Sequence, residues 1–344
     1  MCGDRNVDDD PFACFDDSDQ EGESNEPLGS TYDIDIPQDR ATLNSKDTPK
    51  ADRDESVGVL SFHPGTEMAM LNFVKTTMLA TSSSNNNTKP QDDTARMIER
   101  AGVVLGLVDD FCMQRHWMMH IGQEKANILK QFVVDALEQK LKLFADSNQH
   151  GKQKQSTLKF VELGTYCGYS AIFFVKTILE FQCQRGETIH FRFYTVEVVE
   201  QHVKVAKELF QLAGLQKYIE IVLLSPEQGD SLSTKLLIGS EAAIDFLFID
   251  HDKSRYLQDL LELEACGMVR RGTYVAADNV IFAKIDDYLD YIRELASKGL
   301  VETRLEDTFL EYSLPERISA RMTGNSKEET QDLLKDGIEL SFYL

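Results

Sequence analysis

The sequence predicts an α/β domain in which helices cover a mostly parallel β-sheet. Three observations predict this class. From Leu158 onward, short apolar runs alternate with amphipathic stretches, the order expected of parallel strands joined by helices. Two further strand-like runs near the end of the chain suggest a closing antiparallel pair. Only helical patterns precede Leu158 in the folded part, so we expect added N-terminal helices there.

The first 57 residues differ in composition from the rest of the 344-residue chain. They hold seventeen Asp or Glu residues against five Lys or Arg, and so carry −12 of the net charge of −22. Because they contain few large apolar residues, they cannot bury enough surface to offset chain entropy. We expect a disordered acidic tail at 1–57 and one folded domain at 58–344.

Three helices are expected before the sheet. The first follows Thr66, a candidate N-cap, and should end before Ser82. A polar loop over 82–91, rich in serine and asparagine, is expected to be an insertion. The second and third helices are expected over Asp93–Phe111 and Gly122–Leu141.

The elements of the sheet follow in order. We expect five strands with helices between and after them, and then the closing pair of strands. The five strands are Lys159–Leu163, Phe191–Glu197, Ile219–Leu224, Ile244–Asp250 and Thr273–Ala277. The helices are Ser170–Phe181, Val199–Ala213, Tyr256–Gly267 and Asp286–Gly299, and the closing strands are Val301–Leu305 and Ile338–Tyr343. The charged stretch Pro315–Lys335 is expected to be an insertion.

Composition also disfavours several classes of protein. The acidic balance disfavours a nucleic-acid partner, which would need clustered Lys and Arg. The longest apolar runs, such as Ala171–Val175, fall far short of the roughly 20 residues that cross a bilayer. The start of the chain lacks the pattern of a secretory signal, and the six cysteines show no CxxC spacing. We therefore expect a cytoplasmic protein with no membrane span, and a monomer.

A glycine-containing turn follows the first strand. Gly164 and Gly168 are four residues apart and lead into a helix, and the second strand ends in Glu197. Ligands bind at this edge of open α/β sheets, and an acidic residue there favours a nucleoside with free ribose hydroxyls, as in S-adenosylmethionine or NAD. The spacing differs from the GxGxxG of dinucleotide enzymes. Alternatively, the glycines make only a tight turn and Glu197 is a solvated strand end.

Oxygen-bearing side chains follow the fourth and fifth strands. Asp250 ends the fourth, and Asp278 with Asn279 follows the fifth. If these parallel strands are neighbours, the three side chains converge as hard ligands of the kind that Mg²⁺ prefers. Lys253 lies on the same loop and could act as a base beside a bound cation. Alternatively, the aspartates are ordinary strand-end or helix-cap residues and Lys253 is a surface lysine.

Several motifs together resemble the catechol O-methyltransferase family in order and spacing. They are Glu162-Leu163-Gly164, Tyr166 to Ser170, Asp250-His251 with Lys253, Arg255 to Leu257, Ala277 to Ile281, and Phe309 to Tyr312. The likeness begins near Gly65-Thr66, includes Trp117, Met119 and Gly122, and runs to Asp336-Gly337-Ile338-Glu339 in the last strand. It implies a doubly wound, Rossmann-like sheet of seven strands with the last strand reversed.

The resemblance also implies the role of each site residue. Asp250, Asp278 and Asn279 would hold Mg²⁺, Lys253 would take the proton from the attacking hydroxyl, and Glu311 would hold the other hydroxyl of a small diol acceptor. Trp117 and Met119 would line the acceptor pocket. S-adenosylmethionine would be held by a larger set: Gly164, Tyr166, Ser170, Glu197 and Asp250, with Ile121, Val198, Gln228 and His251 around its methionine and adenine parts.

The sequence departs from the family at two pocket positions. Asp252 stands where the family has a tryptophan, and Ala283 stands where it has a proline. The segment Pro226 to Asp230 near the adenine also differs. We predict a wider or more polar acceptor pocket than is usual in the family.

Three alternative functions differ from methyl transfer to a catechol. A related cation-dependent O-methyltransferase would act on another vicinal diol, such as a phenylpropanoid thioester. A binding module with this fold would lack turnover. An NAD-dependent dehydrogenase is disfavoured by the glycine spacing.

Overall fold

The computed structural model describes residues 65–82, 92–148, 157–236, 243–312 and 334–344. The predicted acidic tail, nearly all of the predicted loop at 82–91 and most of the predicted insertion Pro315–Lys335 lie outside these residues. Within the described part, no helix is both long and apolar enough to cross a membrane.

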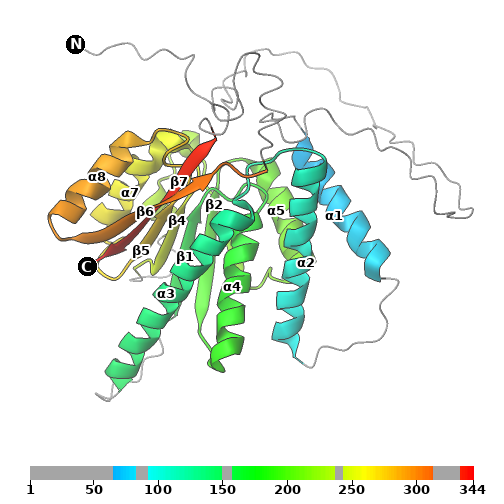
Figure 1. The fold of residues 1–344 in the computed structure, drawn as a ribbon, viewed down its shortest axis with the longest axis horizontal. Helices are drawn as coiled ribbons and strands as arrows, with labels where there is room; N and C mark the ends of the chain where they lie inside the picture. Colours follow the sequence, from blue (N-terminus) through cyan, green and yellow to red (C-terminus); the bar gives the residue numbers. More distant parts are fainter. Residues whose placement is uncertain (1–64, 83–91, 149–156, 237–242, 313–333) are drawn as a thin grey trace, which may run out of the picture.

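A seven-stranded sheet forms the centre of the fold, in the order β3-β2-β1-β4-β5-β7-β6 (Figure 1). The strands are β1 (Leu158–Leu163), β2 (Phe191–Glu197), β3 (Ile219–Leu223), β4 (Phe246–Ile249), β5 (Tyr274–Ala277), β6 (Val301–Phe309) and β7 (Lys335–Tyr343). The first five are parallel, and β7 runs antiparallel to both β5 and β6. The predicted mostly parallel, doubly wound sheet with a reversed last strand is therefore confirmed.

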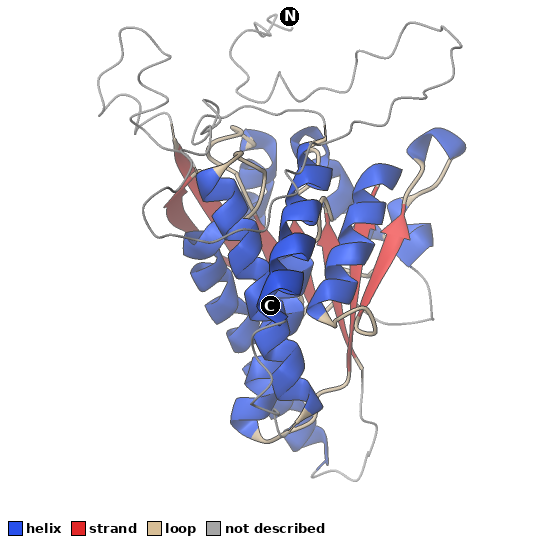
Figure 2. Cartoon of the chain, turned by 90° about the vertical axis from the view of Figure 1, so that its right-hand side faces the viewer, coloured by secondary structure: helices blue, strands red, loops and turns tan. Residues whose placement is uncertain are grey.

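Helices cover both faces of this sheet. One face carries α3 (Gly122–Asn148), α4 (Tyr169–Arg185) and α5 (Glu200–Ala213), and α1 (Thr66–Ser82) and α2 (Asp93–Gln114) pack outside them. Figure 2 shows the strands with helices on either side of them. The other face carries α6 (Leu232–Leu236), α7 (Tyr256–Ala265) and α8 (Asp286–Ser297). Two short 3-10 helices, η3 (Pro226–Gln228) and η4 (Lys253–Arg255), follow β3 and β4.

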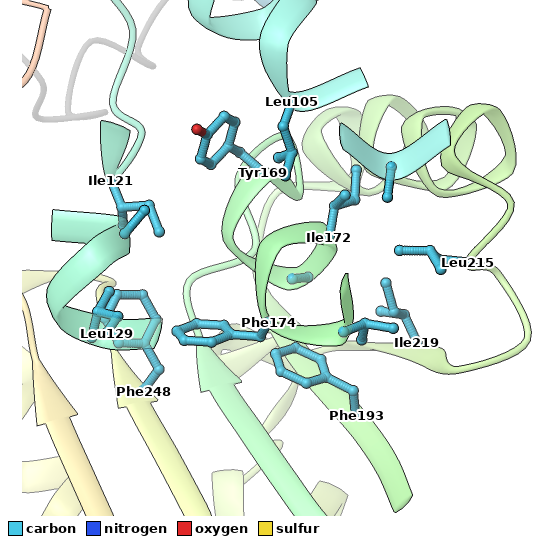
Figure 3. Close-up of a cluster of buried hydrophobic side chains, with 14 of the residues drawn as sticks. Leu105, Ile121, Leu129, Tyr169, Ile172, Phe174, Phe193, Leu215, Ile219 and Phe248 are labelled. Atoms are coloured by element: carbon cyan, nitrogen blue, oxygen red, sulfur yellow. The ribbon is translucent and has the colours of Figure 1, made fainter. Parts of the chain in front are cut away.

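Alternate side chains of the central strands enter two separate cores. In β4, Phe246 and Phe248 pack on the α3–α4 side, whereas Leu247 and Ile249 pack on the α7–α8 side. Successive side chains of a strand point to opposite faces, so a strand buried on both sides is mostly apolar. Figure 3 shows the first core, where Phe174 of α4 lies between Phe193 and Phe248.

The N-terminal helices differ from the prediction at their ends. Gly65 accepts the first helical hydrogen bond, from Ala69, so Thr66 is the first residue inside α1 and not its N-cap. The same helix includes Ser82, where we expected it to have ended. The helix α3 continues from the predicted Leu141 to Asn148, because Phe144 still packs against the core.

Other elements extend beyond their predicted bounds for similar reasons. The helix α2 runs to Gln114, since Phe111 and Cys112 continue its buried stripe. The helix α4 runs to Arg185, and Gly186 ends it in the left-handed conformation. The strands β6 and β7 pair from Val301 to Phe309, over a longer range than their alternating apolar residues indicate. The five-residue helix α6 was not predicted.

The carboxyl ends of β1, β4 and β5 meet at one edge of the sheet. Leu163 pairs with Ile249, and Ile249 pairs with Ala277. Backbone hydrogen bonds continue one residue further, from Asp250 N to Leu163 O at 2.9 Å and from Asp278 N to Ile249 O at 3.0 Å. The side chains that follow these strands are therefore brought to one place, as the sequence predicted.

Candidate active site

The turn after β1 is shaped by its glycines. Gly164 has φ +100°, and a Cβ there would lie 2.0 Å from the backbone oxygen of Asp250. Gly168 has φ +85°, and a Cβ there would lie 2.4 Å from Cε1 of Phe210. Both positions need glycine because another part of the chain occupies the space of a side chain. The sequence suggested that this space admits a ligand, whereas the structure fills it with the Asp250 backbone and the Phe210 ring.

Glu197 is held at the end of β2 by backbone groups. Its Oε2 accepts a hydrogen bond from Tyr166 N at 2.7 Å, and its Oε1 accepts from Val198 N and Val199 N, both at 2.9 Å. The His202 ring lies nearby, with Nδ1 3.6 Å from Glu197 Oε1. The carboxylate is 7% exposed at the edge of the sheet. Its position is thus fixed by backbone groups of the turn after β1 and of the start of α5, so Glu197 is not a solvated strand end.

The remaining predicted cofactor residues differ in their surroundings. Ser170 lies at the start of α4 beside Glu162, Val198 is exposed at the start of the β2–α5 turn, and Gln228 is exposed in η3. His251 lies after β4, where its Nε2 is 2.7 Å from Asp259 Oδ2 and its ring stacks on Tyr256. Ile121 differs from these residues, since it is 1% exposed and belongs to the hydrophobic core.

The predicted metal ligands converge as expected. Burial, together with the nearby Asp250 and Asp336 carboxylates and against the opposing effect of Lys125, raises the pKa of Asp278 to about 6. Asp250 and Asp278 are therefore close enough to repel one another. Asn279 has φ +57°, and its Nδ2 donates to Asp336 Oδ2 at 2.7 Å. This hydrogen bond turns the amide oxygen of Asn279 away from Asp336.

Lys253 lies on η4, directly beside these groups. Its Nζ donates to Asp250 Oδ1 at 2.7 Å and to the Tyr256 hydroxyl at 2.8 Å. The same hydroxyl donates to the backbone oxygen of Asp278 at 3.1 Å. Tyr256 is fully buried, so it forms a fixed link between the lysine and the loop after β5.

Glu311 reaches the site from the loop after β6. Its backbone oxygen accepts a hydrogen bond from Trp117 Nε1 at 2.7 Å. A Cβ on Gly122, at the start of α3, would lie 2.5 Å from Glu311 Cγ, so the Glu311 side chain passes close over this glycine. Burial raises the pKa of Glu311 well above its usual range. Trp117 is 4% exposed and packs with Phe282, whereas Met119 is 37% exposed.

Lys125 is a further charged residue of the site, and sequence analysis missed it. It lies in α3, is 0% exposed, and its Nζ is 2.6 Å from Asp336 Oδ2, 2.8 Å from Asp278 Oδ1 and 3.2 Å from Glu311 Oε1. The available signal was its place in the buried stripe of α3, where it falls four residues after Ile121 and four before Leu129. A lysine in such a stripe needs a partner of opposite charge.

These side chains form a donor set that suits a divalent cation. In the described part of the chain, no group of three or more His, Cys, Asp or Glu is arranged to hold a metal, but the predicted set consists of two carboxylates and one amide. Besides Glu311, whose pKa is raised, three carboxyl groups (Asp250, Asp278 and Asp336) meet two ammonium groups (Lys125 and Lys253), which leaves one negative charge when these five groups are ionised. Oxygen ligands with this charge excess fit Mg²⁺.

The two departures from the family have local structural consequences. Asp252 is exposed, and its Oδ1 accepts hydrogen bonds from Ser254 N at 3.0 Å and from Ser254 Oγ at 2.8 Å. It therefore caps the short helix that carries Lys253. Ala283 N donates to Asn279 O at 3.0 Å, a hydrogen bond that a proline could not make.

Comparison with known proteins gives a consistent set of relatives. A family model described as O-methyltransferase matches residues 152–291. Catechol O-methyltransferase of Sus scrofa is 33% identical over 196 residues, which cover 57% of this chain and 87% of that protein. Catechol O-methyltransferase B of Danio rerio is 31% identical over 211 residues, covering 59% of this chain and 69% of that protein.

The bovine relative matches over a smaller share of its length. Catechol O-methyltransferase of Bos taurus is 30% identical over 211 residues, covering 61% of this chain and 65% of that protein. The chain thus spans just under two thirds of the bovine protein.

Proposed function

This chain belongs to the catechol O-methyltransferase family of O-methyltransferases, and we propose that it transfers the methyl group of S-adenosylmethionine to one hydroxyl of a catechol or similar vicinal diol. The observation that carries the proposal is the convergence of Asp250, Asp278, Asn279 and Lys253 at the carboxyl ends of β4 and β5. When bound, S-adenosylmethionine supplies a methyl group on a positively charged sulfur, and Mg²⁺ supplies charge that favours the ionised form of a hydroxyl.

The residues around β1 and β2 would hold the cofactor. Glu197 offers a carboxylate, fixed by three backbone donors, for ribose hydroxyls. Ser170 lies in the first turn of α4, whose amino terminus favours a carboxylate such as that of the methionine part, and Gly164 and Tyr166 lie in the turn that precedes this helix. His251 and the exposed Val198 and Gln228 would lie around the methionine and adenine parts of the cofactor.

Asp250, Asp278 and Asn279 would hold Mg²⁺, and Lys253 would hold the proton. As a general base, Lys253 would accept the proton of the attacking hydroxyl. Asp250 and Tyr256 fix its Nζ from two sides. Glu311 would orient the second hydroxyl of the diol, because its buried carboxyl group can either donate or accept a hydrogen bond.

The acceptor pocket of this chain is proposed to be more polar than that of its relatives. Asp252 brings an exposed carboxylate to the loop that carries Lys253, and only its Oδ1 is used in capping that loop. A panel of anionic, neutral and cationic catechols tests this. Unequal turnover is expected, with the anionic acceptor poorest, and equal turnover with affinities like those of the relatives would contradict it.

Methyl transfer from labelled S-adenosylmethionine to catechol tests the main proposal. Wild type is assayed with Mg²⁺ and with EDTA, alongside Lys253→Ala and the control Lys207→Ala, which changes an exposed lysine of α5. EDTA should abolish activity, Lys253→Ala should lower it by about 10²–10⁴-fold, and the control should leave it unchanged. Calorimetric titration with the cofactor confirms that each variant still binds it. Activity that survives both EDTA and Lys253→Ala would overturn the mechanism.

A further inference from the structure

Lys125 and Asp336 form a buried ion pair behind the proposed metal ligands. Both side chains are 0% exposed, and they come from α3 and β7, elements far apart in the sequence. Buried ion pairs are weak evidence of stabilisation, because desolvation offsets much of their attraction. Their contacts indicate instead a role in arranging the neighbouring groups.

Asp336 fixes the orientation of Asn279. Its Oδ2 accepts from Asn279 Nδ2 at 2.7 Å and from Lys125 Nζ at 2.6 Å, and its Oδ1 accepts from Phe282 N at 3.1 Å. A terminal amide can rotate by half a turn, so that its oxygen and its nitrogen exchange positions. A carboxylate accepts hydrogen bonds and donates none, so it admits only the orientation in which the amide nitrogen faces it. The amide oxygen is then left for a cation.

Lys125 connects the same carboxylate to the two other functional groups. Its Nζ lies 2.8 Å from Asp278 Oδ1 and 3.2 Å from Glu311 Oε1. A proposed metal ligand and the proposed acceptor-holding residue thus share one ammonium group. Since α3 also provides Gly122, over which Glu311 passes, this helix sets the separation of the metal and acceptor parts of the site.

We propose that Lys125 and Asp336 are positioning residues of the methyl-transfer site: Asp336 aims the oxygen of Asn279 at the metal, and Lys125 holds Asp278 and Glu311 at their working separation. This inference rests on the proposed function. It predicts that losing Asp336 lowers metal affinity by about 10–100-fold, the usual effect of removing a group that orients a metal ligand. Cofactor affinity should not change, because Glu197 and the glycine turn have their own hydrogen bonds.

The first test uses Asp336→Asn, which keeps the shape of the side chain. An amide at this position must direct its own NH₂ either at the donors of Lys125 and Asn279 or at Phe282 N–H, so the orientation of Asn279 is no longer secured. Mn²⁺ affinity is measured by electron paramagnetic resonance, and S-adenosylhomocysteine affinity by calorimetry. The control Asp245→Asn removes the partner of Lys140, a 2.6 Å ion pair at the amino end of β4.

A second variant separates orientation from charge and from loss of folding. Lys125→Met/Asp336→Leu keeps the net charge of the site and removes both members of the buried pair, a replacement by apolar side chains that is often neutral for folding. Asp278 and Glu311 lose their shared ammonium group in this variant. It offers Asn279 no acceptor. We expect at least a tenfold loss of Mn²⁺ affinity and a raised Michaelis constant for the acceptor, with unchanged S-adenosylhomocysteine binding.

The possible outcomes are distinct. Wild-type Mn²⁺ affinity in the double variant would overturn the positioning role, and so would an equal loss of metal and S-adenosylhomocysteine binding. A wild-type protein that binds S-adenosylhomocysteine but no Mn²⁺ would overturn the proposed use of metal, and this inference with it. We expect wild type to bind both Mn²⁺ and S-adenosylhomocysteine. The two Asp336 variants should lose affinity for Mn²⁺ alone, and Asp245→Asn should lose neither.

Discussion

Glu162 should make the stability of this protein fall as pH rises. It lies in β1 with 0% exposure, and its Oε2 accepts a hydrogen bond from the Thr195 hydroxyl at 2.5 Å. Among the described residues, its Oε1 has no hydrogen-bond partner. Burial, with smaller contributions from Asp250 and Glu197 and against the hydroxyls of Ser170 and Thr195, raises the pKa of Glu162 to about 8. The folded protein therefore keeps a proton that the unfolded chain releases.

The sign and size of the effect follow from this difference in proton binding. Between pH 4.5, the usual pKa of the group, and pH 8, the folded state binds more protons than the unfolded state, so the free energy of unfolding decreases with pH. At 1.36 kcal/mol per pH unit, the full interval is worth roughly 5 kcal/mol. Glu162→Gln cannot ionise, and its amide oxygen can still accept from Thr195. Its stability relative to wild type should rise by up to that amount across the interval.

Urea unfolding followed by circular dichroism provides the assay, at pH 5, pH 7 and pH 8.5. Wild type is compared with Glu162→Gln and with Glu302→Gln, which removes an exposed carboxylate from β6. The difference between wild type and Glu162→Gln should change with pH, and the difference for Glu302→Gln should not. If the wild-type and Glu162→Gln curves stay parallel across this range, the carboxyl group is ionised in the folded state and the reasoning fails.

Three further predictions follow from individual contacts. Tyr256→Phe removes the hydroxyl between Lys253 Nζ and Asp278 O, so kcat for methyl transfer should fall by roughly tenfold. Cofactor affinity, measured by calorimetry, should not change, and an unchanged kcat would contradict this prediction. Gly122 has φ +59°, and Gly122→Ala would place a methyl group against Glu311. The Michaelis constant for the acceptor should therefore rise, and the free energy of unfolding should fall by about 1–3 kcal/mol. The control Gly106→Ala, at an open helical position, should be neutral or stabilising. Phe174→Ala should lower the free energy of unfolding by about 3–5 kcal/mol in urea, because the ring is fully buried among four other phenylalanines; a loss below about 1 kcal/mol would show that the core collapses around it.

Much of the site could be predicted because its parts are local in the sequence. Asp250 follows β4 directly, and Asp278 and Asn279 follow β5 directly. Once β4 and β5 are predicted to be neighbouring parallel strands, the proximity of these three residues follows. Lys253, three residues beyond Asp250, comes with the same loop. The helix ends were less predictable: Phe144 extends α3 beyond Leu141 through a packing contact that an apolar pattern does not show.

The sequence by itself determined the order of strands and helices, the acidic character of the first 57 residues, and the glycine and carboxylate positions at the strand ends, since these depend on local periodicity and composition. Only the tertiary structure decided how Lys125 meets Asp336 and Glu311, because about two hundred residues of chain separate α3 from the loop after β6 and from β7, and no local pattern predicts their ion pairs. The reason that position 164 requires glycine is also found only in the tertiary structure. The backbone of Asp250 occupies the space where its side chain would be, and no local pattern contains that contact.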